Sequence, residues 1–128
     1  MLARTLLAAL VSVAFAFPAT AQTPQRHTTV SFSQDILPIF QIRCGTCHSP
    51  GGEGFEKSGL DLRSYQGLMK GTQFGPVVVV GDDQTSNLIV LLDGRADKSL
   101  QMPHNGRKLT TCDRDLIRTW IREGAQDN

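Results

Sequence analysis

The stretch Cys44-Gly45-Thr46-Cys47-His48 decides the fold class of this chain of 128 residues. Cysteines three positions apart lie on neighbouring positions of one helical turn, so both thiols reach one edge of a planar ring and His48 projects beneath it. C-x-x-C-H is the attachment sequence of haem c, in which two thioethers hold the porphyrin and the histidine ligates the iron. We therefore expect Cys44 and Cys47 to carry haem c and His48 to be the proximal iron ligand.

Two other interpretations of the cysteine pair fit the chain less well. A redox dithiol of the thioredoxin type is expected in a βαβ context and has no need of His48. A zinc site needs two further ligands, and the remaining candidates, His104 and Cys112, form no recognised pair. We expect Cys112, the third cysteine, to be packed or idle, with a reactive thiol or an intermolecular disulfide as alternatives.

Residues 1–21 have the pattern of a secretory signal peptide. Arg4 precedes an apolar run over residues 6–17, and Ala19-Thr20-Ala21 is a small-x-small cleavage site. The run is short for a membrane anchor, which needs about 20 apolar residues. We expect cleavage after Ala21, a flexible arm over residues 22–32, one domain over residues 33–128, and no membrane insertion after cleavage.

The charge balance argues against a nucleic-acid partner. The sequence holds 13 basic and 12 acidic residues, and removal of the leader takes away Arg4 and leaves the two counts equal. A nucleic-acid-binding domain would carry a clear basic excess. We interpret the basic cluster of Arg107 and Lys108, with Arg95 and Lys98 nearby, as a solvated face, with a weak docking patch for an acidic partner as the alternative.

Apolar spacing and capping residues predict short helices in the domain. We expect them from an N-cap at Ser33 to the haem motif, over about 64–70, over 87–92, and from a cap at Thr110 or Thr111 to Gly124. Residues 49–54 are a loop by composition. Residues 77–80 are four valines, which we interpret as extended chain against the cofactor, with a buried strand as the alternative.

A second axial ligand decides whether the iron is closed or open to other molecules. Met102 is our candidate, because a thioether has little packing reason to lie in an otherwise polar loop and Pro103 stiffens the chain beside it. Met69 has the spacing of core filler, and His104 and His27 are the imidazole alternatives. Histidine and methionine together leave no vacant position, which favours electron transfer over catalysis.

The chain resembles the class I cytochromes c, and within them the planctomycete-type cytochrome c domain of bacteria. The similar segments are residues 31–40, 44–48, 60–62, 65 with 68–71, 75–82, 86 with 88, 102–103 and 116–121. The resemblance implies an all-α, class I cytochrome c-like fold of about four to five short helices around one covalent haem, with terminal helices crossing near Phe40 and Trp120. It also implies Met102 as the distal ligand and maturation in the bacterial periplasm. Cys112 departs from the family, which usually has an acidic residue there.

These observations favour a periplasmic mono-haem cytochrome that transfers one electron to and from redox partner proteins and acts as a monomer. One alternative is a haem subunit of a periplasmic oxidoreductase complex, in which the chain would share an enzymatic role. Another is a haem enzyme or sensor, such as a peroxidase or gas-binding protein, with a displaceable distal ligand. No catalytic residue is predicted.

Overall fold

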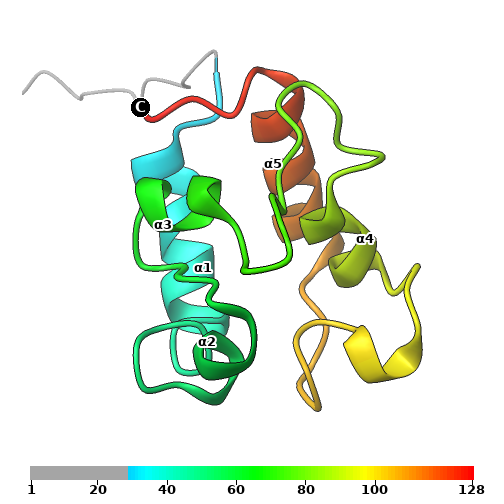
Figure 1. The fold of residues 1–128 in the computed structure, drawn as a ribbon. Coiled ribbons are helices and arrows are strands. Elements are labelled where there is room, and N and C mark those ends of the chain that lie inside the picture. Colours follow the sequence, from blue (N-terminus) through cyan, green and yellow to red (C-terminus); the bar gives the residue numbers. More distant parts are fainter. Residues whose placement is uncertain (1–28) are drawn as a thin grey trace, which may run out of the picture.

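The computed structural model describes residues 29–128, so the predicted signal peptide and most of the predicted arm lie outside the described residues. In chain order the elements are the π-helical turn η1 (Phe32–Ile36), the α-helices α1 (Leu37–Arg43), α2 (Glu53–Ser58), α3 (Tyr65–Lys70) and α4 (Asn87–Asp93), the 3-10 turn η2 (Lys98–Leu100) and the helix α5 (Thr111–Arg122), arranged as in Figure 1. Residues 29–128 contain isolated β-bridges but no strand, so the predicted all-α class is confirmed. None of the described helices is long and apolar enough to cross a membrane.

The first helix begins earlier than predicted, which corrects the boundary between arm and domain. Its N-cap is Ser31, whose hydroxyl accepts a hydrogen bond from the Gln34 N–H at 3.2 Å, while the Asp35 carboxylate accepts one from the Ser31 N–H at 2.9 Å. Phe32 is 2% exposed. Pro38 lacks an N–H, so a π-helical turn precedes it and the regular α-helix follows. Residues 31–32 therefore belong to the packed domain and not to an arm.

Helix α2 was not predicted, because glycine and proline dominate the composition just before it. It begins after Gly52, and Gly59 ends it in the left-handed conformation at φ 75°. Glu53 and Glu56 lie in the first turn, where negative charge is favourable, and Glu53 pairs with Lys57 one turn later at 2.6 Å. These glycines therefore bound the helix.

The other predicted helices are confirmed. Ser64 caps α3, and the Thr110 hydroxyl and the Asp113 carboxylate form a capping box at the start of α5. Ser86 is the N-cap residue of α4, but its hydroxyl bonds the Val79 N–H and the Asp82 carbonyl at 2.8 and 2.7 Å and does not cap the helix. The valine run ending at residue 80 forms no strand: its first half is buried and its second half is exposed.

Three aromatic rings join the two ends of the domain. The ring centroid of Phe32 lies 5.3 Å from that of Tyr65 and 5.4 Å from that of Trp120. The Tyr65 hydroxyl donates to the Ala125 carbonyl at 2.9 Å, which ties α3 to the chain after α5. Trp120 thus meets the ring of Phe32, and Phe40 lies buried in the same core. This aromatic cluster fixes η1 and α1 relative to α5.

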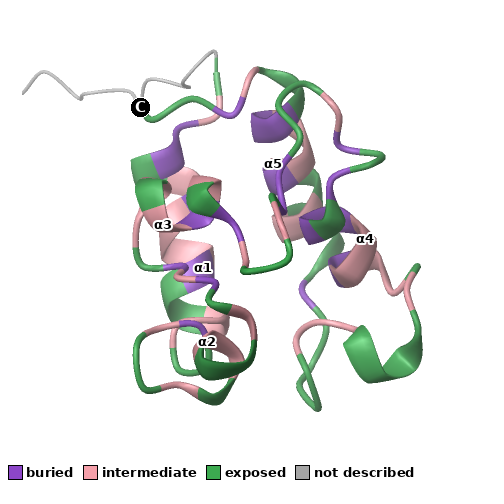
Figure 2. Cartoon of the chain, in the orientation of Figure 1, coloured by how far each residue is buried: buried purple, intermediate pink, exposed green. Residues whose placement is uncertain are grey.

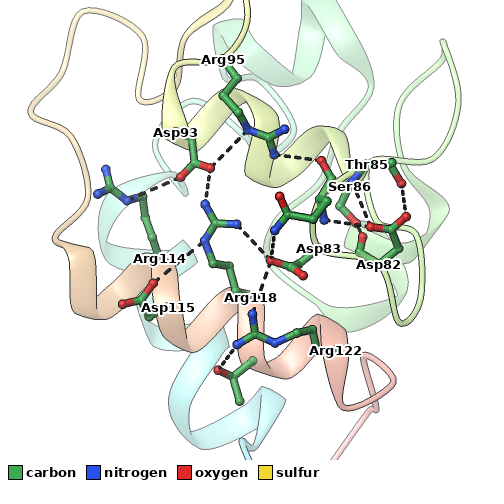
Figure 3. Close-up of polar contacts among 12 residues, drawn as sticks. Asp82, Asp83, Thr85, Ser86, Asp93, Arg95, Arg114, Asp115, Arg118 and Arg122 are labelled. Carbon is green, nitrogen blue, oxygen red and sulfur yellow. Dashed lines mark hydrogen bonds and ion pairs between the residues drawn. The ribbon is translucent and has the colours of Figure 1, made fainter.

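Ion pairs join α4 to α5 (Figure 3). Arg118 of α5 lies between two carboxylates: its Nη1 is 3.0 Å from Asp83 Oδ2, and its Nη2 bonds Asp93. Burial opposes the charge of Arg118, but the carboxylates of Asp93 and Asp83 prevail and raise its pKa above the usual value. The Arg118 side chain is 19% exposed, so this pairing is less screened than a surface ion pair. The ion pair with Asp93 holds the end of α4 against α5, and residues 95–108 follow α4.

Residues 95–108, which we call the methionine segment, contain Met102 and follow α4. No residue of this segment or of α2 is buried. Figure 2 shows both in half-buried and exposed colours, whereas buried residues gather along η1, α4 and α5. In Figure 1 the segment, drawn yellow to orange, lies at the same end of the molecule as α2. The hydrophobic core is therefore concentrated away from this end.

Candidate haem-binding site

The motif forms one helical turn directly after α1. Cys44 is the C-cap of α1, and its N–H donates to the Phe40 carbonyl at 2.8 Å. The N–H groups of Cys47 and His48 both donate to the Cys44 carbonyl, at 3.1 and 2.9 Å. Cys44 is half-buried, Cys47 is exposed and His48 is 8% exposed. Both thiols and the imidazole therefore come from a single turn, as the spacing predicts.

The chain that follows folds back over this turn. The Phe55 N–H donates to the Cys47 carbonyl at 2.8 Å, and the Leu62 N–H donates to the His48 carbonyl at 2.9 Å. Gly54 permits the approach of α2: a Cβ there would lie 2.9 Å from His48 Cε1 and 3.0 Å from His48 Nε2. Real carbon contacts are about 3.5–4.0 Å, so the α2 backbone and the imidazole are in close contact only because residue 54 is glycine.

His48 has the properties of a metal ligand. Burial lowers the pKa of its imidazole, and the Leu60 backbone offsets this effect in part, so the neutral form is favoured at pH 7. Neutral imidazole is the form that ligates metals. His48 Nδ1 is buried and has no hydrogen-bond partner among the described residues. A buried unpaired nitrogen costs about 1–3 kcal/mol, so this imidazole has a ring nitrogen that a bound group could pair. These properties fit haem iron.

The two motif cysteines form no disulfide with each other or with Cys112. Burial raises the pKa of the Cys44 thiol to about 11, with Arg43 acting against this effect and Cys47 adding to it. Cys44 is therefore protonated at neutral pH. A protonated thiol is a poor nucleophile in disulfide exchange, so Cys44 is poorly suited to the redox-dithiol chemistry considered above.

A hydrogen bond links the methionine segment to α1, the helix that directly precedes the motif. Met102 is half-buried and packs against the core, and its N–H donates to the Leu91 carbonyl of α4 at 3.2 Å. From the other side, Arg43 Nη2 donates to the Arg107 carbonyl at 2.6 Å. Arg43 is the last residue of α1 and directly precedes the motif. The segment that carries Met102 is thus held by α4 on one side and by α1 on the other.

The alternative ligands lie in different settings. Met69, on α3, packs against the core as a filler residue would. His104 is exposed in the methionine segment, and His27 lies outside the described residues. Cys112 is an exposed free thiol in the first turn of α5. No structural feature here favours any of these residues over Met102.

Sequence reasoning missed two contributors to the site, Gly54 and Arg43. The composition of residues 49–54 predicts a loop, and only the folded position of α2 shows that Gly54 lies against His48. Arg107 was noted for its charge, yet the atom that bonds Arg43 is its backbone carbonyl, which no residue type reveals.

Residues 44–106 match the family described as Planctomycete cytochrome C. The match begins at the first motif cysteine and extends past Met102. The match covers just under half of the chain and, together with the helical fold, supports a c-type cytochrome, a class of electron carriers with covalently bound haem c. More narrowly, the chain carries a cytochrome c domain of the planctomycete type, and domains of this type are typically exported. The chain matches no curated protein and no solved structure.

Proposed function

We propose that this chain is an exported mono-haem cytochrome that transfers one electron between redox partner proteins in the bacterial periplasm. Cys44 and Cys47 would hold the haem through thioethers, and His48 and Met102 would be its axial ligands. The observation that carries the proposal is the hydrogen bond from Arg43 to the Arg107 carbonyl, since it holds the segment with Met102 against the helix that leads into the motif.

The haem, when bound, supplies an iron that alternates between its ferrous and ferric states. His48 contributes a neutral imidazole, because burial lowers its pKa. Met102 contributes a soft thioether, which raises the reduction potential relative to a second imidazole. With His48 and Met102 both bound to the iron, no position would be open for substrate, which would suit outer-sphere electron transfer. A haem enzyme or gas sensor would need Met102 to leave the iron.

The fold supports a carrier that changes shape little between redox states. The Phe55 and Leu62 N–H groups bond the motif backbone. The Arg118 ion pairs fix α4, whose Leu91 carbonyl accepts from Met102. The equal counts of basic and acidic residues after the leader favour protein partners over nucleic acid, and we propose that the chain acts as a monomer.

An absorption study of the mature protein tests this proposal. Haem that stays with the chain in acidified acetone, and a pyridine haemochrome of one haem per chain, are expected for Cys44 and Cys47 thioethers. Met102→Ala is expected to change the ferric spectrum, and Met69→Ala serves as the control because Met69, like Met102, is a partly buried methionine packed against the core. Extractable haem would contradict the covalent assignment. An unchanged ferric spectrum in Met102→Ala would contradict the ligand assignment.

A further inference from the structure

We propose that Arg43 is a positioning residue, which ties the methionine segment to α1 and thereby slows the release of Met102 from the iron. This inference rests on the proposed ligation by Met102. It adds a function for a side chain that is neither a haem attachment point nor an axial ligand.

The contact has the geometry of a strong hydrogen bond. Arg43 Nη2 lies 2.6 Å from the Arg107 carbonyl oxygen, across 64 positions of sequence. The donor is a charged guanidinium, and charge-assisted bonds are shorter and stronger than neutral ones. Because the acceptor is a backbone atom, the bond restrains the path of the chain at residue 107 and does not depend on a second side-chain rotamer.

The methionine segment has few other restraints. Its start is held to α4, where the Arg95 N–H donates to the Val90 carbonyl at 2.9 Å and the Met102 N–H donates to the Leu91 carbonyl at 3.2 Å. Its end is followed by Leu109, which is 3% exposed. Among the hydrogen bonds of residues 29–128, only the one from Arg43 links this segment to α1 and the motif.

A second, weaker attraction acts at the same place. The carboxyl pKa of Glu53, at the start of α2, is lowered mainly by Lys57 and to a small extent by His104 of the methionine segment. Glu53 and His104 are both exposed, so salt screens their attraction. The hydrogen bond from Arg43 is therefore the main polar restraint between the methionine segment and the helices α1 and α2.

The consequence can be measured with carbon monoxide. Carbon monoxide binds ferrous haem at the distal position. If Met102 occupies that position, the rate of carbon monoxide binding reports how often Met102 leaves the iron. A hydrogen bond at this level of exposure changes an opening equilibrium by about threefold to tenfold. Arg43→Met keeps the aliphatic stem and removes the donor, so we expect carbon monoxide to bind the reduced mature protein about threefold to tenfold faster. Arg43→Lys keeps the charge and one flexible donor, so its rate of carbon monoxide binding is expected to lie between those of wild type and Arg43→Met.

The control is Arg63→Met, which makes the same change of charge and side chain. Arg63 pairs with Asp61 at 2.7 Å and makes no hydrogen bond to the methionine segment. A second readout is hydrogen exchange at the Met102 amide, whose N–H bonds the Leu91 carbonyl. Exchange reports opening of the segment whether or not Met102 ligates the iron.

The outcomes separate this inference from the proposed function. Faster carbon monoxide binding and faster Met102 exchange in Arg43→Met, with Arg63→Met unchanged, would support the role of Arg43. Wild-type rates of both in Arg43→Met would overturn it and leave the ligation by Met102 intact. If wild type bound carbon monoxide as fast as Met102→Ala, the proposed ligation by Met102 would be wrong. Hydrogen exchange at the Met102 amide alone would then test whether Arg43 restrains the segment. Equal effects of both arginine variants would also overturn the inference, since charge would explain them.

Discussion

Gly54→Ala is expected to destabilise the protein although it places alanine in a helix. A Cβ at residue 54 would lie 2.9 Å from His48 Cε1 and 3.1 Å from the Cys47 carbonyl oxygen. Carbon contacts are normally about 3.5–4.0 Å, so the imidazole or α2 must move by roughly 0.6 Å or more. Such overpacking costs about 1–3 kcal/mol. The helical preference of alanine returns about 0.5–1 kcal/mol, so we expect a net loss of roughly 1 kcal/mol, within a range of about 0–2.5 kcal/mol.

Thermal unfolding of the mature protein measures this loss. For a domain of this size, a loss of about 1 kcal/mol corresponds to a drop in Tm of roughly 4–8 °C. Lys57→Ala is the matched control, since it changes the same helix at a side chain that is 75% exposed, and its cost should stay below about 0.5 kcal/mol. The absorption spectrum of Gly54→Ala should also change, because the contact is with His48. A Gly54→Ala protein at least as stable as wild type, with an unchanged spectrum, would refute the contact between α2 and the imidazole.

Three further predictions concern the framework around the site. Arg118→Met should cost about 2–4 kcal/mol in unfolding free energy, because it removes the cation that the buried Asp83 and the half-buried Asp93 share; a loss below about 0.5 kcal/mol in chemical denaturation would show that the network contributes little. Thr110→Ala should cost about 0.5–2 kcal/mol through loss of the α5 cap, while Thr111→Ala, one residue later, should cost less, and equal losses would contradict the capping role. Hydrogen bonds from the Thr85 hydroxyl and backbone hold the carboxyl pKa of Asp82 below its usual value. Its contribution to stability is therefore full above its unfolded pKa of about 4 and is lost as the pH falls through the lower folded value. The stability difference between wild type and Asp82→Asn should shrink in that acid range, and a constant difference would contradict this.

Features that depend on neighbouring residues were predictable from the sequence. The haem motif is a local pattern, and its three side chains lie in one turn because cysteine spacing alone determines that placement. The sequence predicts helices from about residue 64 and from a cap at Thr110 or Thr111, and the structure has Ser64 as the cap of α3 and Thr110 as the cap of α5.

Local signals were ambiguous where two residues offered the same chemistry. Ser31 and Ser33 are both good N-caps, and the choice of Ser31 depends on the burial of Phe32 against Tyr65 and Trp120, which is a tertiary contact. In the same way, the glycines around α2 gave a loop composition, although the helix fits between them.

The contacts that shape the site lie far apart in the chain. Arg43 reaches a backbone carbonyl 64 positions away, and backbone acceptors carry no signature in a sequence. Gly54 matters because α2 packs on His48, which follows from the fold and not from the glycine itself. A methionine is unusual in a polar loop, which makes Met102 a candidate from the sequence, but the contact that holds its segment to α1 spans 64 positions and carries no local signal.

A potentiometric titration of the mature protein, followed by haem absorbance, tests the central claim most directly. One haem with His48 and Met102 as ligands predicts a single one-electron Nernst wave. Met102→Ala should shift that wave to a lower potential, because the thioether that favours the ferrous state is gone, while Met69→Ala should leave it in place. More than one wave in wild type, or the same potential in wild type and Met102→Ala, would contradict the account.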